Sequence, residues 1–171
     1  WGTVAGATSA SYTTGLTTYA DDHDDQYRCV ISAVGASSPA TTNAVTLTVQ
    51  RTFSITGQPS NATANEGATG TFSVTTSASS GTVTYQWERS DDGGANYASV
   101  GSATSASYTT PTLVFANDNA DRYRVVASLV GAAASITSTH GELTVLRVYQ
   151  SIHNQHLLLL LKDRLLPLLL V

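Results

Sequence analysis

The chain has 171 residues, a formal net charge of −4, and only 12% charged residues. Its arginines are scattered and Lys162 is its only lysine, which excludes the basic stripe that a nucleic-acid-binding protein needs to neutralise phosphates. A lone cysteine, Cys29, excludes an intrachain disulfide. The sequence opens on Trp1 without a signal peptide, so we interpret it as a fragment. Its Thr-, Val- and Tyr-rich body is typical of a solvated β surface outside the cell.

The first fifty residues recur later in the chain. The sequence ATSASYTT occupies residues 7–14 and again residues 103–110, an offset of 96. The same offset places YADDHDDQYRCVISAVGA over FANDNADRYRVVASLVGA, and TLTV over ELTV. We therefore interpret residues 1–50 as the C-terminal half of one unit and residues 51–146 as a whole unit. The half unit lacks the strands that would cover its apolar face, so we do not expect it to fold stably alone.

The acidic run DDHDD at residues 21–25 has two interpretations. Hard cations such as Ca²⁺ take several carboxylate oxygens, which makes this run a weak calcium candidate. The equivalent run of the whole unit, NDNAD, keeps only two acids, and this favours a structural turn. We expect His23 to be solvated rather than catalytic. The weak calcium candidates are Asp21, Asp22, Asp24 and Asp25.

Residues 51–146 show a period of two, which predicts β-strands. The segments TFSVT (71–75), VTYQW (83–87), YRVVAS (123–128) and ELTV (142–145) alternate between apolar and polar side chains, with turn-forming residues between them. No helical pattern interrupts them. Short strands at this spacing predict an all-β antiparallel sandwich.

Particular residues then resemble a known family. Trp87 lies mid-strand after the segment EGATGTFSV, and DRYRVV carries the Asp-x-Tyr pattern of a tyrosine corner. The sequence resembles the immunoglobulin-like fold, and most of all the Thr/Ala-rich tandem immunoglobulin-like repeats of large bacterial or phage surface proteins. The resemblance implies an immunoglobulin-like antiparallel β-sandwich, with one complete domain (51–146) preceded by the C-terminal half of another (1–50).

The resemblance also implies roles for single residues. The two cysteine positions of the family are valines here, and Cys29 aligns with the second of them, so we expect a small buried thiol. Burying one large side chain contributes about 1.5–3 kcal/mol, which in sum suffices without a disulfide. The expected core is Trp87, Tyr123, Val74, Val125, Phe72 and Tyr85; the expected tyrosine corner is Tyr27 and Tyr123 with Asp25 and Asp121.

Two shorter motifs lie in the whole unit. SDDGGANY (90–97) resembles an Asp-box hairpin, which we interpret as a structural turn rather than a binding loop. It leaves Tyr97 as the only free aromatic candidate for a ligand. The glycosylation pattern at Asn61 is interpreted as chance. We see no catalytic, phosphate-binding or zinc-binding motif, so we expect no enzyme activity and no cofactor.

The tail, residues 147–171, differs from the rest. Its run of leucines is broken by Lys162, Asp163 and Arg164, so it makes a poor membrane span. Our hypothesis is that the tail is a frameshifted reading of a third repeat: in the shifted frame, His153-Asn154 encodes glutamine or stop, and Gln58 stands at the equivalent position. The alternative is a genuine hydrophobic end that binds a membrane or a partner.

The predicted function is that of a non-catalytic spacer or adhesive module in a large extracellular protein of a cell surface or virion. Neighbouring immunoglobulin-like repeats in the same chain would be its partners, with a surface protein or glycan as ligand. The alternative is an accessory carbohydrate-binding or linker module of a secreted multidomain enzyme. A linker stiffened by Ca²⁺ is the third interpretation.

Overall fold

The computed structural model describes residues 1–147, so the predicted tail lies outside the described residues apart from Arg147. Two four-residue helices and fourteen short strands make up the described part. The helices are α1 (Tyr19–Asp22) and α2 (Phe115–Asp118). The strands are β1 (Gln26–Tyr27), β2 (Val30–Ile31), β3 (Ala40–Thr41), β4 (Val45–Thr46), β5 (Phe53–Gly57), β6 (Ala62–Asn65), β7 (Thr71–Ser73), β8 (Thr75–Ala78), β9 (Val83–Ser90), β10 (Ala98–Ser99), β11 (Ser107–Thr109), β12 (Arg122–Leu129), β13 (Ile136–Thr137) and β14 (Gly141–Leu146).

The larger sheet is built on β9 and β12. These strands pair antiparallel over their whole length, from Arg122 opposite Ser90 to Leu129 opposite Val83. The sheet runs in the order β10-β9-β12-β14-β6, and β13 pairs with Val126 and Ala127 in the C-terminal half of β12. The pairing of β14 with β6 is parallel, an arrangement that no local sequence pattern predicts.

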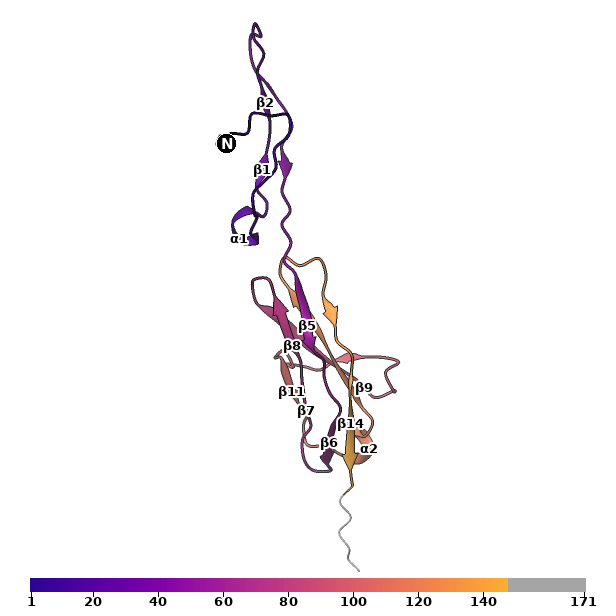
Figure 1. Ribbon diagram of the computed structural model, residues 1–171. Helices are drawn as coiled ribbons and strands as arrows, with labels where there is room; N and C mark the ends of the chain where they lie inside the picture. Colours follow the sequence, from indigo (N-terminus) through magenta and orange to yellow (C-terminus); the bar gives the residue numbers. More distant parts are fainter. Residues whose placement is uncertain (148–171) are drawn as a thin grey trace, which may run out of the picture.

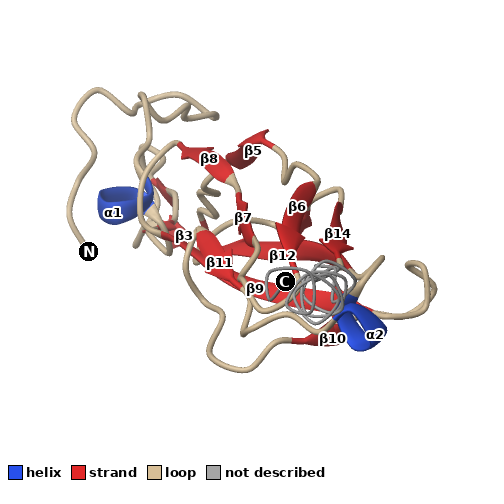
Figure 2. Ribbon diagram, turned by 90° about the horizontal axis from the view of Figure 1, so that it is seen from below, coloured by secondary structure: helices blue, strands red, loops and turns tan. Residues whose placement is uncertain are grey.

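The second layer consists of two short antiparallel pairs, β5 with β8 and β11 with β7. Val74 separates β7 from β8. Its N–H donates to the Ala106 carbonyl, next to β11, and so stays on the β11 side and does not pair with β5. Figure 2 shows β5, β7 and β8 on one side of the domain and β9 and β12 on the other. The two layers enclose the core.

The core is centred on Trp87. Its side chain is 0% exposed, and its indole N–H donates to the Ser105 carbonyl at 2.8 Å. The Phe72 ring stacks on Tyr123 at 4.7 Å and approaches Trp87 at 6.5 Å. Burial alternates along β12, so the period of two in the sequence corresponds to one inward face. The predicted all-β immunoglobulin-like sandwich is confirmed.

The valines at the family's cysteine positions pack inside the sandwich. Val125 is 0% exposed and Val74 4%. Tyr85 is half-buried, and its hydroxyl lies 2.7 Å from the Thr76 hydroxyl. Apolar contacts therefore join the two layers at the positions where the resembled family carries sulfur.

Residues 1–50 repeat the pairing of the last strands of the domain. Gln26 lies opposite Thr46, as Arg122 lies opposite Glu142, and Val30 lies opposite Thr41, as Val126 lies opposite Thr137. No second layer covers these strands among the described residues, and most of their side chains are exposed. Cys29 is exposed for this reason, and the expectation of a buried thiol is wrong.

The molecule is elongated. Figure 1 shows residues 1–50 at one end, with α1 next to the point where the chain enters β5, and β14 leaving the domain at the opposite end. The chain thus enters the domain at one pole and leaves it at the other. None of the helices in residues 1–147 is long and apolar enough to cross a membrane.

Candidate functional site

A charge pair lies under the corner that precedes β12. The Arg89 Nε lies 2.6 Å from Asp121 Oδ2, and the Asp121 side chain is only 3% exposed. Asp118 lies 3.5 Å from the same guanidinium. Burial raises the pKa of Asp121, and the charge of Arg89 opposes this rise without cancelling it. The pair therefore ties β9 to the start of β12 at the edge of the core.

The tyrosine corner of the domain uses the same carboxylate. The Tyr123 hydroxyl donates to Asp121 Oδ2 at 3.4 Å, and the ring is buried. Burial and the Asp121 charge raise the pKa of Tyr123, so the hydroxyl stays protonated. In residues 1–50, Tyr27 is half-buried and Asp25 is exposed. The side-chain pair is thus formed in the domain, while its counterparts lie on an uncovered strand.

The first two acids of the run bond to Thr18, the N-cap residue of α1. Asp22 Oδ2 accepts from the Thr18 N–H at 2.6 Å, and Asp21 Oδ2 accepts from the Thr18 hydroxyl at 2.8 Å. Asp24 and Asp25 are exposed, and Asp24 has a φ of +68°. In the part of the chain that the structure describes, no three His, Cys, Asp or Glu side chains are grouped so that they could hold a metal.

His23 is not the solvated residue that we expected. Its Nδ1 accepts from the Val49 N–H at 3.2 Å, and its ring stacks on Tyr19 with centroids 4.4 Å apart. Asn119 occupies the equivalent position in the domain, and its Oδ1 accepts from the Val145 N–H at 2.9 Å. Each side chain anchors the C-terminal segment of its unit to the helical corner.

The hairpin at residues 90–97 uses its polar groups internally. Asp92 Oδ1 accepts from the Ser90 hydroxyl at 2.7 Å and from the Asn96 N–H at 2.9 Å, and Asp92 Oδ2 accepts from the Asn96 amide at 2.8 Å. These bonds hold the pKa of Asp92 well below its usual range. Gly93 and Gly94 have φ values of +76° and +94°, which the turn requires. This geometry is that of a closed structural turn.

Tyr97 is not a free aromatic. The Arg124 guanidinium lies 3.8 Å from its ring centroid, and Arg124 Nε donates to Glu88 Oε2 at 2.7 Å. One face of the ring is therefore covered by a cation that a carboxylate holds in place. A second pair, Arg122 with Glu142 at 3.2 Å, lies on the same face of the sheet.

A depression of about 500 Å³ lies between the hairpin and the loop that follows β11. Arg89, Tyr97, Tyr108 and Asp118 contribute to its lining. It combines aromatic rings with an arginine and a carboxylate, the groups that orient a small polar ligand. Arg89 and Asp118 already pair with each other, so a ligand would have to compete with that contact.

Residues 1–50 also repeat aromatic contacts of the domain. Arg28 lies 4.2 Å from the Trp1 ring centroid, at the positions equivalent to Arg124 and Tyr97. The rings of Tyr12 and Tyr27 are 5.8 Å apart with planes at 34°, while those of their counterparts, Tyr108 and Tyr123, are 5.6 Å apart with planes at the same 34°. An open concavity of about 820 Å³ lies over these side chains.

Comparison with known protein families gives one match. A family model described as a domain of unknown function (DUF8696) matches residues 55–147. The chain belongs to this family. The match covers the sandwich from β5 to the end of β14 and includes Arg147.

Solved structures similar to the chain include a chimeric titin Z1Z2 functionalised with a KLER peptide from decorin (24% identity, TM-score 0.40, 56% of this chain and 95% of that one). Sidekick-1 immunoglobulin domains 1–5 are 19% identical with a TM-score of 0.44, over 73% of this chain and 26% of that one. Domain D1 of Duf (Kirre) is 21% identical with a TM-score of 0.40, over 57% of this chain and 100% of that one. Among curated proteins, none matches the sequence.

Two sets of residues in this member of the family were not predicted from the sequence. One is the set of charged partners on β9, Glu88 and Arg89, because that strand was interpreted through its apolar face. The other lies where residues 1–50 meet the domain: the Arg51 guanidinium lies 4.1 Å from the Tyr19 ring centroid. The sequence carried one signal for these residues, because the offset of 96 pairs Arg51 with Arg147 and Tyr19 with the aromatic Phe115.

Proposed function

We propose that the chain is a non-catalytic immunoglobulin-like module that serves as a structural spacer or adhesive unit in a large extracellular protein of a cell surface or virion. The observation that carries this proposal is that the same contacts recur 96 residues apart. The bond from the Thr18 N–H to Asp22 recurs between Val114 and Asp118, at 2.6 Å in both places. Such recurrence supports a chain of like units, each of which contacts its neighbours.

The recurrence also supports the proposed division of the chain. Residues 1–50 form the C-terminal half of one unit, residues 51–146 form a whole unit, and residues 147–171 form a tail. The connector at residues 50–52 is short, which limits the reach between units and favours an extended stalk. Neighbouring immunoglobulin-like units are then the partners of each domain.

The half unit offers specific groups to strands that would complete it. Asp25 and Arg28 stand at the positions of Asp121 and Arg124, whose partners in the domain are Arg89 and Glu88 of β9. A strand with the Trp-Glu-Arg order of residues 87–89 would therefore pair its charges with Asp25 and Arg28 while its indole covered the Tyr12–Tyr27 pair. We propose that a β9-like strand completes residues 1–50.

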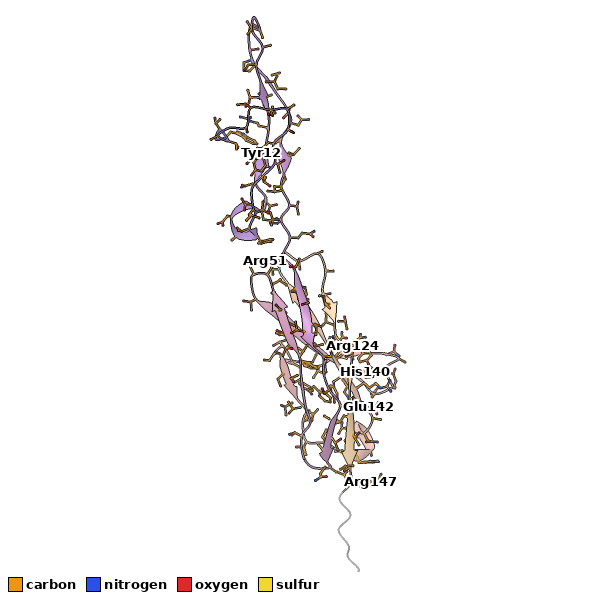
Figure 3. All side chains as sticks on the ribbon, viewed as in Figure 1. Tyr12, Arg51, Arg124, His140, Glu142 and Arg147 are labelled. Atoms are coloured by element: carbon orange, nitrogen blue, oxygen red, sulfur yellow. The ribbon has the colours of Figure 1, made fainter. Side chains whose placement is uncertain are left out.

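The topology suits a spacer that bears tension. Figure 3 places Arg51 and Arg147 at opposite ends of the domain, so a pull on the chain acts along its long axis. The strands β6 and β14 are parallel, with paired residues from Leu143 opposite Ala62 to Leu146 opposite Asn65. A pull along this axis loads the hydrogen bonds between them together, in shear, rather than one after another.

Electron microscopy of the full-length parent protein tests the spacer proposal. We expect a thread of similar domains in line, with this unit inside it. A compact catalytic body with this domain folded against it would contradict the proposal and favour the enzyme-linked alternative.

An accessory carbohydrate-binding role is the second candidate, and the depression beside Tyr97 and Tyr108 is the observation that favours it. Titration of the ¹⁵N-labelled chain with neutral oligosaccharides tests it. Chemical-shift changes confined to the amides of residues 89–100 and 108–113 would support sugar binding. An unchanged spectrum would count against it and leave the spacer as the remaining role.

A further inference from the structure

We propose that Arg51 and Tyr19 form a rigid joint between successive immunoglobulin-like units, and that the chain carries the matching halves of the same joint at its two ends, each fitted to another copy of this unit. This inference rests on the proposed spacer function. It adds that successive units are held in a fixed orientation, whereas a spacer could also be a flexible chain of units.

Arg51 contacts both sides of the junction. Its guanidinium lies 4.1 Å from the ring centroid of Tyr19, in α1 of the N-terminal part. Its Nε donates to the Ser80 hydroxyl and its Nη1 donates to the Val130 carbonyl, both at 3.1 Å, in two loops of the domain. The Arg51 backbone N–H donates to the Gly131 carbonyl at 2.9 Å. One connector residue thus fixes an aromatic ring of one unit over the pole of the next.

Gly131 completes the seat for the ring. It has a φ of +86°, and a Cβ at this position would overlap the Tyr19 ring. The ring therefore lies directly on the backbone of the turn after β12. Glycine is the residue that permits both this backbone conformation and this approach.

The arginine, the aromatic ring and the glycine of the joint each occur twice, 96 residues apart. Phe115 matches Tyr19, Arg147 matches Arg51, and Gly35 matches Gly131. Arg147 lies 4.1 Å from the Phe115 ring centroid, the same separation as between Arg51 and Tyr19. The stack of arginine on an aromatic ring is thus already formed at the far pole of the domain, where Figure 3 labels Arg147.

The other end carries the complementary seat. Gly35 has a φ of +82°, and no described atom other than those of Gly35 and its two neighbours in the chain lies within 4 Å of the position its Cβ would take. Val34 beside it is fully exposed, as Val130 is largely exposed beside Gly131. An aromatic ring held by an arginine therefore fits over Gly35, and a turn with an exposed Val-Gly pair fits under Phe115 and Arg147. Contacts of this head-to-tail kind extend an array without closing it.

The full chain allows a direct test, because Cys29 is its only cysteine and is exposed in the N-terminal part. A lanthanide tag on Cys29 aligns that part in a magnetic field, and residual dipolar couplings are then measured on the amides of residues 52–146. A rigid joint predicts couplings in the domain that fit the same alignment tensor as those of residues 1–50. Couplings near zero in the wild-type domain, while residues 1–50 keep theirs, would overturn the proposal.

Substitutions make the test specific. Arg51→Ala should reduce the couplings of residues 52–146 to near zero, while those of residues 1–50 persist. Arg124→Ala removes an equivalent stack on Tyr97 inside the domain and should leave the couplings unchanged. Full couplings in Arg51→Ala would overturn the joint. The spacer proposal would survive that result as a flexible chain of units, because microscopy of the parent protein tests it separately.

The half of the joint formed by Phe115 and Arg147 is tested in a longer chain, in which a second copy of residues 52–147 is joined directly after Arg147. A single alignment tensor should then extend to the added copy, and Arg147→Ala should release that copy while residues 52–146 keep their couplings. An added copy that never shares the tensor would overturn the assignment of Phe115 and Arg147.

Discussion

Arg89 and Asp121 form the charge pair on which the corner of the sandwich depends: Nε and Oδ2 lie 2.6 Å apart, and the carboxylate is almost fully buried. Two other partners of Asp121 converge here, since the Tyr123 hydroxyl donates to Oδ2 and the Leu143 N–H donates to its backbone carbonyl. One residue thus connects β9, β12 and β14.

Replacing Arg89 by methionine should destabilise the domain by about 3 kcal/mol, the lower end of the range for breaking a buried pair, because the Arg89 side chain is itself partly exposed. The free energy of unfolding in urea, followed by Trp87 fluorescence, measures this. The double variant with Asp121→Asn should recover part of the loss, because no carboxylate then stays buried without a partner. Strictly additive losses would show that the two side chains do not interact.

The hairpin should make stability fall in acid. The pKa of Asp92 is lowered in the folded state, so its stabilising contribution is complete above its ordinary value of 3.8 and is lost as the pH falls below it. Asp92→Asn should therefore lower stability at neutral pH, and its difference from the wild type should shrink as the pH falls. Urea titrations at several pH values measure this. A difference that stays constant would contradict the assigned hydrogen bonds.

Asp121 should act in the opposite direction. Its folded-state pKa is raised, so its contribution favours folding below the unfolded-state pKa and is lost as the pH rises through the folded-state value. The chemical shift of the Asp121 side-chain carboxyl carbon, followed by NMR from pH 2 to 7, measures this pKa, and its midpoint should lie above 3.8. A midpoint below 3.8 would mean that the charge of Arg89 outweighs burial.

Equivalent positions should differ in their sensitivity to truncation. Val125→Ala should cost about 2 kcal/mol, because two methyl groups leave a fully buried site. Cys29→Ala, at the matching position, should change stability by less than about 0.5 kcal/mol because Cys29 is exposed. Thermal unfolding of both variants compares them directly. A large effect at Cys29 would mean that something covers the half unit in solution.

Calcium should not stiffen the chain. One oxygen of Asp21 and one of Asp22 already accept hydrogen bonds from Thr18, and no three possible ligands are grouped in residues 1–147. Melting temperatures measured with Ca²⁺ in the millimolar range and with a chelator should therefore agree. A clear rise with Ca²⁺ that Asp21→Asn abolishes would restore the calcium-stiffened linker.

The sandwich could be predicted from the sequence because its signals are local. Alternation along β9 and β12 assigns Trp87 and Val125 to one inward face without any knowledge of their partners. The parallel pairing of β14 with β6 had no such signal, because it depends on how distant segments meet. The helices α1 and α2 have four residues each, too few to show a helical period.

The site residues likewise differ in whether their contacts are local in the sequence. The turn around Asp92 was predicted from residues close in sequence, whereas the cover that Arg124 provides over Tyr97 depends on the register of β9 against β12. The prediction that Cys29 is buried was wrong. It assumed the environment of Val125, but residues 1–50 lack the second β layer that buries Val125. Arg51 was overlooked because a connector was considered for its length and not for its side chain.

The length of an array of units tests the extended, head-to-tail arrangement most directly. Small-angle X-ray scattering is recorded for residues 1–147 followed by none, one or two further copies of residues 52–147. The maximum dimension should grow by the same increment with each copy, because the chain enters every unit at one pole and leaves it at the other. A maximum dimension that levels off, with the copies folding back on one another, would contradict this arrangement.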